Sequence, residues 1–486
     1  MPKTSQQDLL QRFQPIFYPK SIAVVGVSQN TLKVGSAWFK AIINMGFTGP
    51  LYPVNPHGGE LLGYKIYPSL RSIPGDVDYV VVSIPRDNVP ALLDDAAAKG
   101  VKAVHFFTAG FSESSDAYGP ELEKKLVEKA RQGGFRVVGV NCLGAHSVEG
   151  GLPYGPAGEK GKLGSVSFIT QSGGIGEKLT ELGTARGIHF NKGISFGNGI
   201  DLDGPDYLEY LAVDPKTEII GAYFEGTRNG DRLARVITEA AQAKPLVVWK
   251  AGRTDVGAAA AKSHTGSLAA SPAIWSALIK QAGAIEVHNI EDLSDALLIF
   301  QMLPRPRNKL QGNGIAVIGG MADGGGGISV SASDACADAG LNIPQLTKET
   351  RDKLTDIIGH VGSILRNPVD VSQTGSNPTR IRQAAEIVLN DPNIDLLLVQ
   401  QDIGVLLRYL PFEVAQTVNN IFIDLKNKQH KPLVLVLPPG THEAERVQLE
   451  QGLAQASIPV FPSMERAAKA IKSFTEYWQR RTSAGD

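Results

Sequence analysis

Short apolar runs alternate with segments of helical periodicity along most of the chain. In the first third, runs of strand length occur at 21–25, 49–54, 79–84, 103–107 and 137–140. Helical patterns lie between them, for example at 89–99 and 120–133. Continuous apolar strands that alternate with helices predict a parallel sheet that is covered on both faces. We therefore expect a doubly wound domain of about 150 residues at the start of the chain.

The same pattern restarts twice further along. A second set of strands is predicted at 164–169, 193–195, 219–223 and 245–249. The segment 303–307, Leu-Pro-Arg-Pro-Arg, is typical of a linker. A third set follows at 315–318, 396–399 and 432–436. The fold class is therefore α/β, with three consecutive doubly wound parallel-sheet domains.

Composition excludes several classes of protein. Lys and Arg (48) nearly balance Asp and Glu (49), which gives no indication of a nucleic-acid partner or an anionic membrane surface. Cys142 and Cys336 lie far apart, so a disulfide framework or a metal cluster is not expected, and a reducing cytoplasm is the simplest location. Neither a secretory signal nor an apolar stretch of membrane-spanning length is apparent.

The predicted strands of the first domain end in glycine, proline and small polar residues. Gly26, Val27 and Ser28 follow the first strand, and Lys33 precedes the next helix. Because strand carboxyl ends form the ligand crevice of an open parallel sheet, these ends together favour a site for a nucleotide-like ligand over simple strand termination. The corresponding residues after the next three strands are Pro53 and Asn55, Ile84 and Pro85, and Thr108, Ala109 and Gly110.

The second domain contains a candidate phosphate site in the segment Thr-Gln-Ser-Gly-Gly at 170–174. Ser172 is suited to cap a helix, and Gly173 and Gly174 leave the first helical amides uncovered. A phosphate or phosphoryl group would fit there. An ordinary capped helix explains the same residues equally well.

His264 lies in a stretch rich in glycine and alanine, between small hydroxyl residues and Gly266. Such a loop can approach a partner closely, and a neutral imidazole nitrogen can attack phosphorus to form a reactive phosphoramidate. Glu225 follows a predicted strand, where its carboxylate could accept a hydrogen bond from the His264 ring. A solvated glutamate at the edge of a loop is the alternative.

These motifs, in this order, resemble the α subunit of the ADP-forming acyl-CoA synthetases, relatives of succinyl-CoA synthetase. The motifs that carry the resemblance are 25–28, 53–56, 84–85, 108–111, 170–174, 195–198, 250–254, 263–269 and 367–370, of which 263–269 is the specific one. The resemblance implies a Rossmann-like CoA-binding domain at 8–148, a flavodoxin-like ligase domain with a phosphohistidine loop at 149–303, and a second flavodoxin-like domain at 304–486. Val27 replaces a smaller residue of the family pattern, and 321–327 is unusually rich in glycine, so we transfer no ligand role to that segment.

The resemblance also implies the chemistry. Acyl-CoA, phosphate and ADP would give a carboxylic acid, CoA and ATP through an acyl phosphate and phospho-His264, with Glu225 supporting the histidine. Ser172, Gly173 and Gly174 would hold phosphate, and the crevice residues of the first domain would hold CoA. No segment is typical of an ATP-grasp domain, so ADP or ATP with Mg would bind a separate β subunit in a hetero-oligomer.

Two alternatives belong to other functional classes. A regulatory CoA-sensing protein of the same fold would bind CoA without phosphorylation of His264. An NAD-dependent oxidoreductase is disfavoured because G-x-G-x-x-G is missing and because Val54-Asn55-Pro56 replaces the acidic residue expected after the second strand. No residue pattern selects acetate over larger acids.

Overall fold

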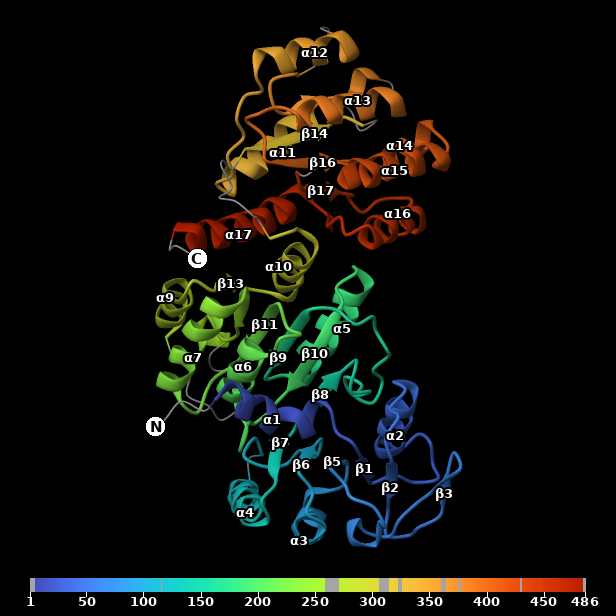
Figure 1. Cartoon of the computed structure of the whole chain (residues 1–486), viewed down its shortest axis with the longest axis vertical. Coiled ribbons are helices and arrows are strands. Elements are labelled where there is room, and N and C mark those ends of the chain that lie inside the picture. The colour runs from blue at the N-terminus through green and yellow to red at the C-terminus, as the bar shows by residue number, and fades with distance from the viewer. Residues whose placement is uncertain are drawn as a thin grey trace. The chain divides into compact units, whose positions relative to one another are not determined.

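The computed structural model describes 5–114, 116–257, 271–305, 314–321, 326–359, 364–374, 377–428 and 431–483. The chain forms two compact units, Met1–Thr184 with Ile188–Leu293, and Ala185–Gly187 with Ser294–Asp486. Both units are built of parallel sheets flanked by helices (Figure 1). Among the described residues, no helix has the length and apolar character needed to cross a bilayer.

The first unit begins with a five-stranded parallel sheet in the order β2-β1-β5-β6-β7. Its central strands are fully buried apolar runs, as a sheet covered on both faces requires. Its strands are β1 (Ile22–Val25), β2 (Leu51–Val54), β5 (Tyr79–Val82), β6 (Ala103–Phe106) and β7 (Arg136–Gly139), and a hairpin of β3 (Glu60–Leu61) and β4 (Tyr64–Lys65) lies apart. Its helices are α2 (Val34–Asn44), α3 (Val89–Lys99) and α4 (Tyr118–Gly133), with 3-10 turns η1 (Leu70–Ser72) and η2 (Arg86–Asn88).

The second sheet of this unit has six strands in the order β13-β12-β11-β9-β10-β8. They are β8 (Gly144–Ser147), β9 (Val166–Thr170), β10 (Phe190–Ser195), β11 (Ile219–Phe224), β12 (Leu246–Lys250) and β13 (Ile285–Val287). The accompanying helices are α5 (Gly173–Ala185), α6 (Gly204–Val213), α7 (Gly230–Ala243), α9 (Pro272–Ala282) and α10 (Ile290–Met302), and α10 ends in the second unit. The edge strand β8 is antiparallel to β10 and was not predicted.

The second unit contains a five-stranded parallel sheet in the order β15-β14-β16-β17-β18. Its strands are β14 (Ile315–Gly319), β15 (Val369–Asp370), β16 (Leu396–Gln400), β17 (Leu433–Val436) and β18 (Val460–Phe461). The helices are α11 (Gly326–Asp338), α12 (Lys348–Ile358), α13 (Pro378–Leu389), α14 (Ile403–Tyr409), α15 (Phe412–Lys428), α16 (Glu443–Gln455) and α17 (Met464–Ser483), with a 3-10 turn η3 (Ser372–Thr374). The predicted succession of three α/β sheets is confirmed. The three domain boundaries stay predictions.

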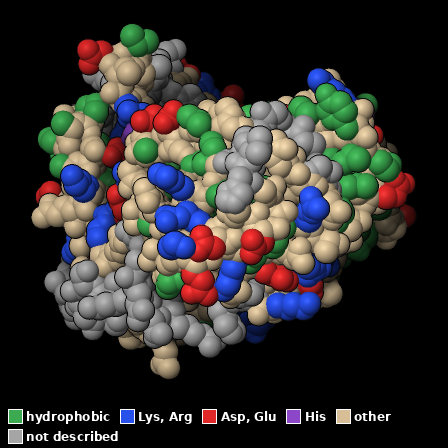
Figure 2. Space-filling view, turned by 90° about the horizontal axis from the view of Figure 1, so that it is seen from above, with side chains coloured by type: hydrophobic (Ala, Val, Ile, Leu, Met, Phe, Trp, Pro, Cys, Tyr) green, Lys and Arg blue, Asp and Glu red, His purple; other side chains and the backbone are tan. Residues whose placement is uncertain are grey.

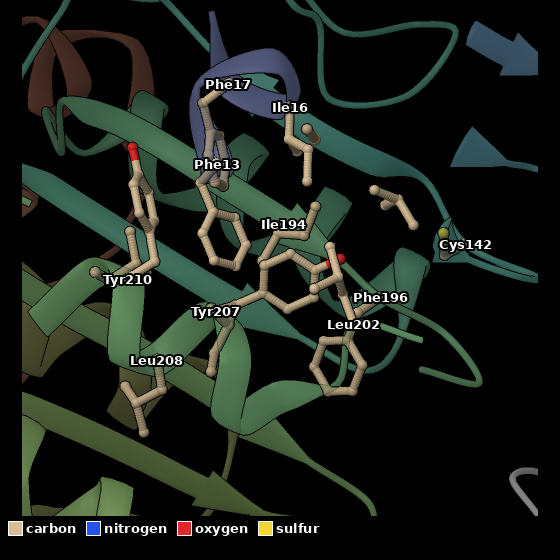
Figure 3. Packing of buried hydrophobic residues seen from close by; sticks show 14 of the residues in the cluster. Phe13, Ile16, Phe17, Cys142, Ile194, Phe196, Leu202, Tyr207, Leu208 and Tyr210 are labelled. Atoms are coloured by element: carbon tan, nitrogen blue, oxygen red, sulfur yellow. The ribbon is translucent and has the colours of Figure 1, made fainter. Parts of the chain in front are cut away.

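Helix α1 (Gln6–Phe17) packs against α6 of the second sheet, although it precedes the first sheet in the chain. Phe13 stacks on Tyr210 with ring centroids 4.8 Å apart, and Phe17 stacks on the same ring at 5.0 Å (Figure 3). Phe13 also meets Tyr207 edge-on at 5.6 Å. Such pairs contribute about 0.5–1.5 kcal/mol each beyond the burial of their area. Helix α1 is therefore fixed to α6, a helix that accompanies the second sheet.

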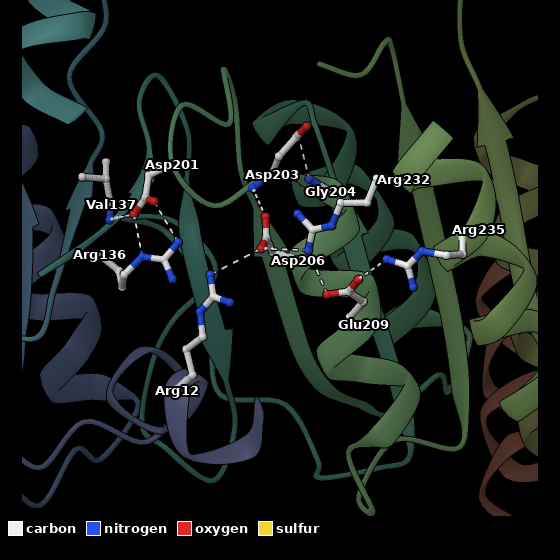
Figure 4. A network of polar contacts seen from close by, with 10 residues as sticks. All are labelled: Arg12, Arg136, Val137, Asp201, Asp203, Gly204, Asp206, Glu209, Arg232 and Arg235. Atoms are coloured by element: carbon white, nitrogen blue, oxygen red, sulfur yellow. Dashed lines mark hydrogen bonds and ion pairs between the residues drawn. The ribbon is translucent and has the colours of Figure 1, made fainter. Parts of the chain in front are cut away.

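A network of ion pairs connects the two sheets of the first unit (Figure 4). Arg136 at the start of β7 forms a bidentate pair with Asp201, with both N···O distances 2.8 Å. Asp206 on α6 accepts from Arg12 of α1 and from Arg232 of α7. Planar two-point pairs of this kind fix orientation as well as distance. The loops of both sheets are therefore held in a defined arrangement.

Charged side chains of both signs are interspersed on the face drawn in Figure 2, where neither sign forms a continuous patch. This agrees with the near balance of acidic and basic residues in the sequence.

Candidate active site

A cavity of about 740 Å³ lies within the first unit, between loops of its two sheets. Loops that follow β1, β5 and β6 form one wall, and loops that follow β9 and β10 form the other. All of these loops leave the carboxyl ends of parallel strands, where open α/β sheets bind ligands. Nine of the predicted site residues line the cavity: Gly26, Lys33, Ile84, Pro85, Thr108, Ala109, Ser172, Gly173 and Gly174.

The first turn brings two backbone segments very close together. Gly26 has a φ of +100°, and a Cβ added there would lie 2.2 Å from the carbonyl oxygen of Ser83. A Cβ on Gly35 would lie 2.3 Å from the carbonyl oxygen of Gly26. Only glycine fits both positions, and the start of α2 can therefore reach the cavity.

Val27 and Ser28 were predicted to contact the ligand but do not line the cavity. Val27 is completely buried in the hydrophobic core. The backbone N–H of Ser28 donates to Ser36 Oγ at 3.0 Å, and Ser36 Oγ donates to the Ser28 carbonyl at 2.7 Å. In this structure both residues hold the turn that carries Gly26.

Pro53, Asn55 and Gly110 also lie outside the cavity lining. Pro53 is part of β2, and Asn55 Oδ1 accepts from the backbone N–H of His57 at 3.0 Å. Gly110 has a φ of +99°, and its carbonyl accepts from Arg86 Nη1 at 2.6 Å. In the structure these three residues shape the loops around the cavity. A direct contact with CoA stays a prediction for each of them.

Ser172 caps helix α5, as the sequence predicts. Its Oγ accepts from the backbone N–H of Ile175 at 3.4 Å, and the helix begins at Gly173. A Cβ added at Gly174 would meet no atom within 4 Å, so this part of the first turn faces open space. The first amides of a helix have no partner within the helix and attract anions. The cavity wall at α5 is therefore suited to phosphate.

Gln171 lines the cavity and was not assigned a role from the sequence. Its Oε1 accepts from the backbone N–H groups of Glu225 and Gly226, at 2.8 and 3.0 Å. Two donors on one oxygen fix the orientation of the amide, so Nε2 is the atom left to donate elsewhere. The sequence could not reveal this role, because the two backbone donors come from another strand.

Glu225 follows β11 and is only 6% exposed, so it is not the solvated glutamate considered as the alternative. The Tyr223 hydroxyl donates to its Oε1 at 3.2 Å. Lys250 Nζ donates to the Glu225 carbonyl at 2.8 Å. Burial lowers the pKa of Lys250, and the nearby Glu225 carboxylate acts in the opposite direction.

His264 lies outside the described residues, because the structure describes no residue from 258 to 270. Its pairing with Glu225 therefore stays a prediction. The described chain before this segment ends in helical residues 255–257, and the Gly257 N–H donates to Thr254 Oγ1 at 3.1 Å.

Arg86 and Cys142 also line the cavity. Arg86 donates to Asp116 Oδ2 at 2.7 Å, and this bond holds the pKa of Asp116 at about 2. Burial raises the pKa of the Cys142 thiol to about 12, so this thiol is protonated and unreactive near neutral pH.

Among the residues that the structure describes, no group of three or more His, Cys, Asp or Glu side chains could hold a metal ion.

Three family models match successive parts of the chain. A CoA binding domain matches 20–147, a succinyl-CoA ligase like flavodoxin domain matches 163–300, and a ligase-CoA domain matches 317–484. Their order is the order of the three sheets.

Relatives of known function match the chain along most of its length. The α subunit of an ADP-forming acetate–CoA ligase I from Pyrococcus furiosus is 33% identical, over 96% of this chain and 97% of the relative. An ADP-forming acetate–CoA ligase I from Archaeoglobus fulgidus is 36% identical, and the match covers 79% of this chain but 54% of the relative.

A solved structure has the same fold throughout. Acetyl-coenzyme A synthetase 1 of Candidatus Korarchaeum cryptofilum, in complex with phosphate and ADP, matches with a TM-score of 0.84 and 31% identity. The match covers 97% of this chain and 98% of that one.

Proposed function

The chain belongs to the family of ADP-forming acyl-CoA ligases, and we propose that it is the CoA-binding subunit that carries a phosphoryl group on His264. In the net reaction, an acyl-CoA, phosphate and ADP give a carboxylic acid, CoA and ATP. The alternative of a CoA sensor without catalysis gains no support from these relatives, because they are ligases.

One observation carries this proposal most strongly. The same cavity is lined by the crevice of the CoA-binding domain and by the first turn of α5. A thioester held by the crevice would therefore meet a phosphate held by Ser172, Gly173 and Gly174. Bringing two reactants together in this way removes much of the entropic cost of a bimolecular step.

The proposed reaction has two steps in this subunit. A phosphate oxygen attacks the thioester carbonyl, the C–S bond breaks, and the CoA thiolate leaves and takes up a proton. A neutral nitrogen of His264 then attacks phosphorus, the P–O bond to the acyl group breaks, and the carboxylate leaves. Gln171 Nε2 is placed to donate to an oxygen that becomes negative in either step.

Glu225 would support the histidine. A buried carboxylate that accepts from one ring N–H fixes the tautomer and stabilises the positive charge that develops when the other nitrogen attacks. The Tyr223 hydroxyl bond and the two backbone contacts to Gln171 and Lys250 hold Glu225 in place.

The final transfer to ADP would take place on a separate β subunit with an ATP-grasp domain, which would also bind Mg. The relative from P. furiosus is named an α subunit and matches almost end to end. The match to the A. fulgidus relative covers about half of that longer protein. A cytoplasmic hetero-oligomer remains part of the proposal.

A coupled ATP assay tests the proposal. The purified chain, its candidate β partner and the two together would each receive ADP, Mg, phosphate and one of several acyl-CoAs. We expect ATP only from the two together, only with phosphate present, and with release of CoA equal to the ATP formed. CoA binding by the chain without any such activity, or binding of NAD in place of CoA, would support the alternatives.

A further inference from the structure

Glu113 connects the two walls of the cavity. Its Oε1 accepts from the backbone N–H groups of Gly110 and Phe111, at 2.6 and 3.2 Å. Its Oε2 accepts from Asn198 Nδ2 at 2.6 Å. The first two donors belong to the loop after β6, and Asn198 belongs to the loop after β10. One carboxylate therefore holds both loops.

A second set of bonds closes this connection into a ring. Arg228 Nε donates to the Asn198 carbonyl at 3.2 Å, and Arg228 Nη2 donates to Glu123 Oε1 at 2.7 Å. Glu123 Oε2 in turn accepts from the backbone N–H of Ser112, next to Glu113, at 3.3 Å. Asn198 and Glu123 are 8% and 7% exposed, so water competes little for these bonds.

The ring determines the separation of residues that line the cavity. Thr108 and Ala109 lie in the loop that Glu113 holds, immediately before Gly110, and Asn198 lines the cavity from the other wall. An ionised carboxylate only accepts hydrogen bonds, so all three groups around Glu113 must present donors. Bonds to an ionised group are shorter and stronger than neutral ones.

We propose that Glu113 and Asn198 are positioning residues for CoA, because their bond keeps the two walls at the spacing that CoA requires. The inference rests on the proposed function, since it takes CoA as the ligand of this cavity. Neither residue needs to touch CoA for this effect.

The pair offers a test in which the direction of one hydrogen bond is reversed. In Glu113→Gln, the amide oxygen can still accept from the loop, but the charge-assisted bond is lost. The new NH₂ group can bond Asn198 only if the Asn198 amide turns over and the Ser112 hydroxyl donates to it. In Asn198→Asp, two carboxylates face each other. In the double variant, the amide introduced at position 113 can donate to the carboxylate introduced at position 198. The hydroxyl of Ser112, which in the wild type accepts from Asn198 Nδ2 at 3.2 Å, can then donate to that carboxylate instead.

CoA titration by calorimetry on the full chain measures the effect. We expect each single variant to bind CoA about tenfold more weakly, the scale of one charge-assisted hydrogen bond, and the double variant to return to within about threefold of the wild type. Glu121→Gln on α4 makes the same charge change as Glu113→Gln at an exposed site, and it should leave the affinity unchanged.

The outcomes of the CoA titrations distinguish failure of the proposed function from failure of the inference about Glu113 and Asn198. If the wild type fails to bind CoA, the proposed function is wrong, and the inference about Glu113 and Asn198 is then wrong as well. If the wild type binds CoA and both single variants bind equally well, even with lower melting temperatures, the bond is only structural and the inference is wrong. Loss of affinity that the double variant does not restore also contradicts it. If a single variant does not fold, Asn198→Ala removes the bond without repulsion and should show the same tenfold loss.

Discussion

At the scale of single residues, Glu225 is the described carboxylate to which we assign support of His264. It is buried at the end of β11, and Tyr223 donates to its carboxylate. We expect Glu225→Gln to slow phosphorylation of the chain by about 100-fold or more, because a neutral amide does not stabilise an imidazolium. The measurement is the single-turnover rate of phosphoryl incorporation. Glu121→Gln, at an exposed position on α4 outside the cavity lining, serves as the control of equal charge change. An unchanged rate in Glu225→Gln would remove Glu225 from the mechanism.

Individual residues were predictable to different degrees. The places of Gly26, Ser172 and Gly174 at the cavity could be predicted because turn and cap chemistry is encoded within a few neighbouring positions, and their ligand contacts stay predictions. The roles of Gln171 and Glu113 could not be predicted, because each depends on a partner from a distant part of the chain: the Glu225 backbone for Gln171 and Asn198 for Glu113. Val27 was also predicted as a CoA contact; its side chain is buried in the core, and the contact stays a prediction.

At the scale of elements, a change at the N-terminus of α5 tests whether this terminus binds phosphate. Ser172→Ala removes the cap on Ile175 and should cost about 1 kcal/mol of unfolding free energy. Because the first turn would then be less ordered, we also expect the KM for phosphate to rise several-fold, with little change in the KM for acyl-CoA. Ser172→Thr retains a hydroxyl cap and should restore both values. A loss of stability without any change in the phosphate KM would show that the cap has only a structural role.

The elements with strong periodicity were predicted well. Helix α3 spans the expected Val89–Lys99, and the longer parallel strands fall on the predicted apolar runs. The short parallel strands β13, β15 and β18 were not predicted. Strand β8 was missed because Gly-Ala-His-Ser has no apolar or β-branched run, and pairing with β10 in the folded protein creates it. The packing of α1 on α6 could likewise not be predicted, because it depends on aromatic residues such as Phe13 and Tyr210 that are 197 positions apart.

At the scale of the whole molecule, two buried histidines predict how stability depends on pH. Burial lowers the pKa of His105 and His146 from 6.5 to about 4, although each ring is hydrogen-bonded to a backbone carbonyl. Between pH 6.5 and 4 the unfolded chain therefore binds protons that the folded chain does not. The unfolding free energy should fall as the pH is lowered through this window, and each histidine contributes up to about 3 kcal/mol.

Denaturant unfolding at pH 7.5, 5.5 and 4.5 checks this prediction. His146→Gln keeps a donor for the Leu152 carbonyl and should reduce the pH slope by about one proton below pH 6. At pH 7.5 neither histidine contributes to the slope. An equal slope in the variant and the wild type would mean that His146 is not buried in its neutral form.

The two sheets of the first unit bring together a cavity and a buried carboxylate, and the proposed function connects them to one reaction. The central claim is that this chain carries the phosphoryl group on His264. The direct measurement is incubation of the purified chain with acyl-CoA and ³²P-labelled phosphate, followed by mapping of the label. We predict one acid-labile, base-stable label per chain at His264, its loss in His264→Ala, and its transfer to ADP only when the β partner is added. Label that persists in His264→Ala, or a wild-type chain that stays unlabelled while the complete assembly makes ATP, would contradict the account.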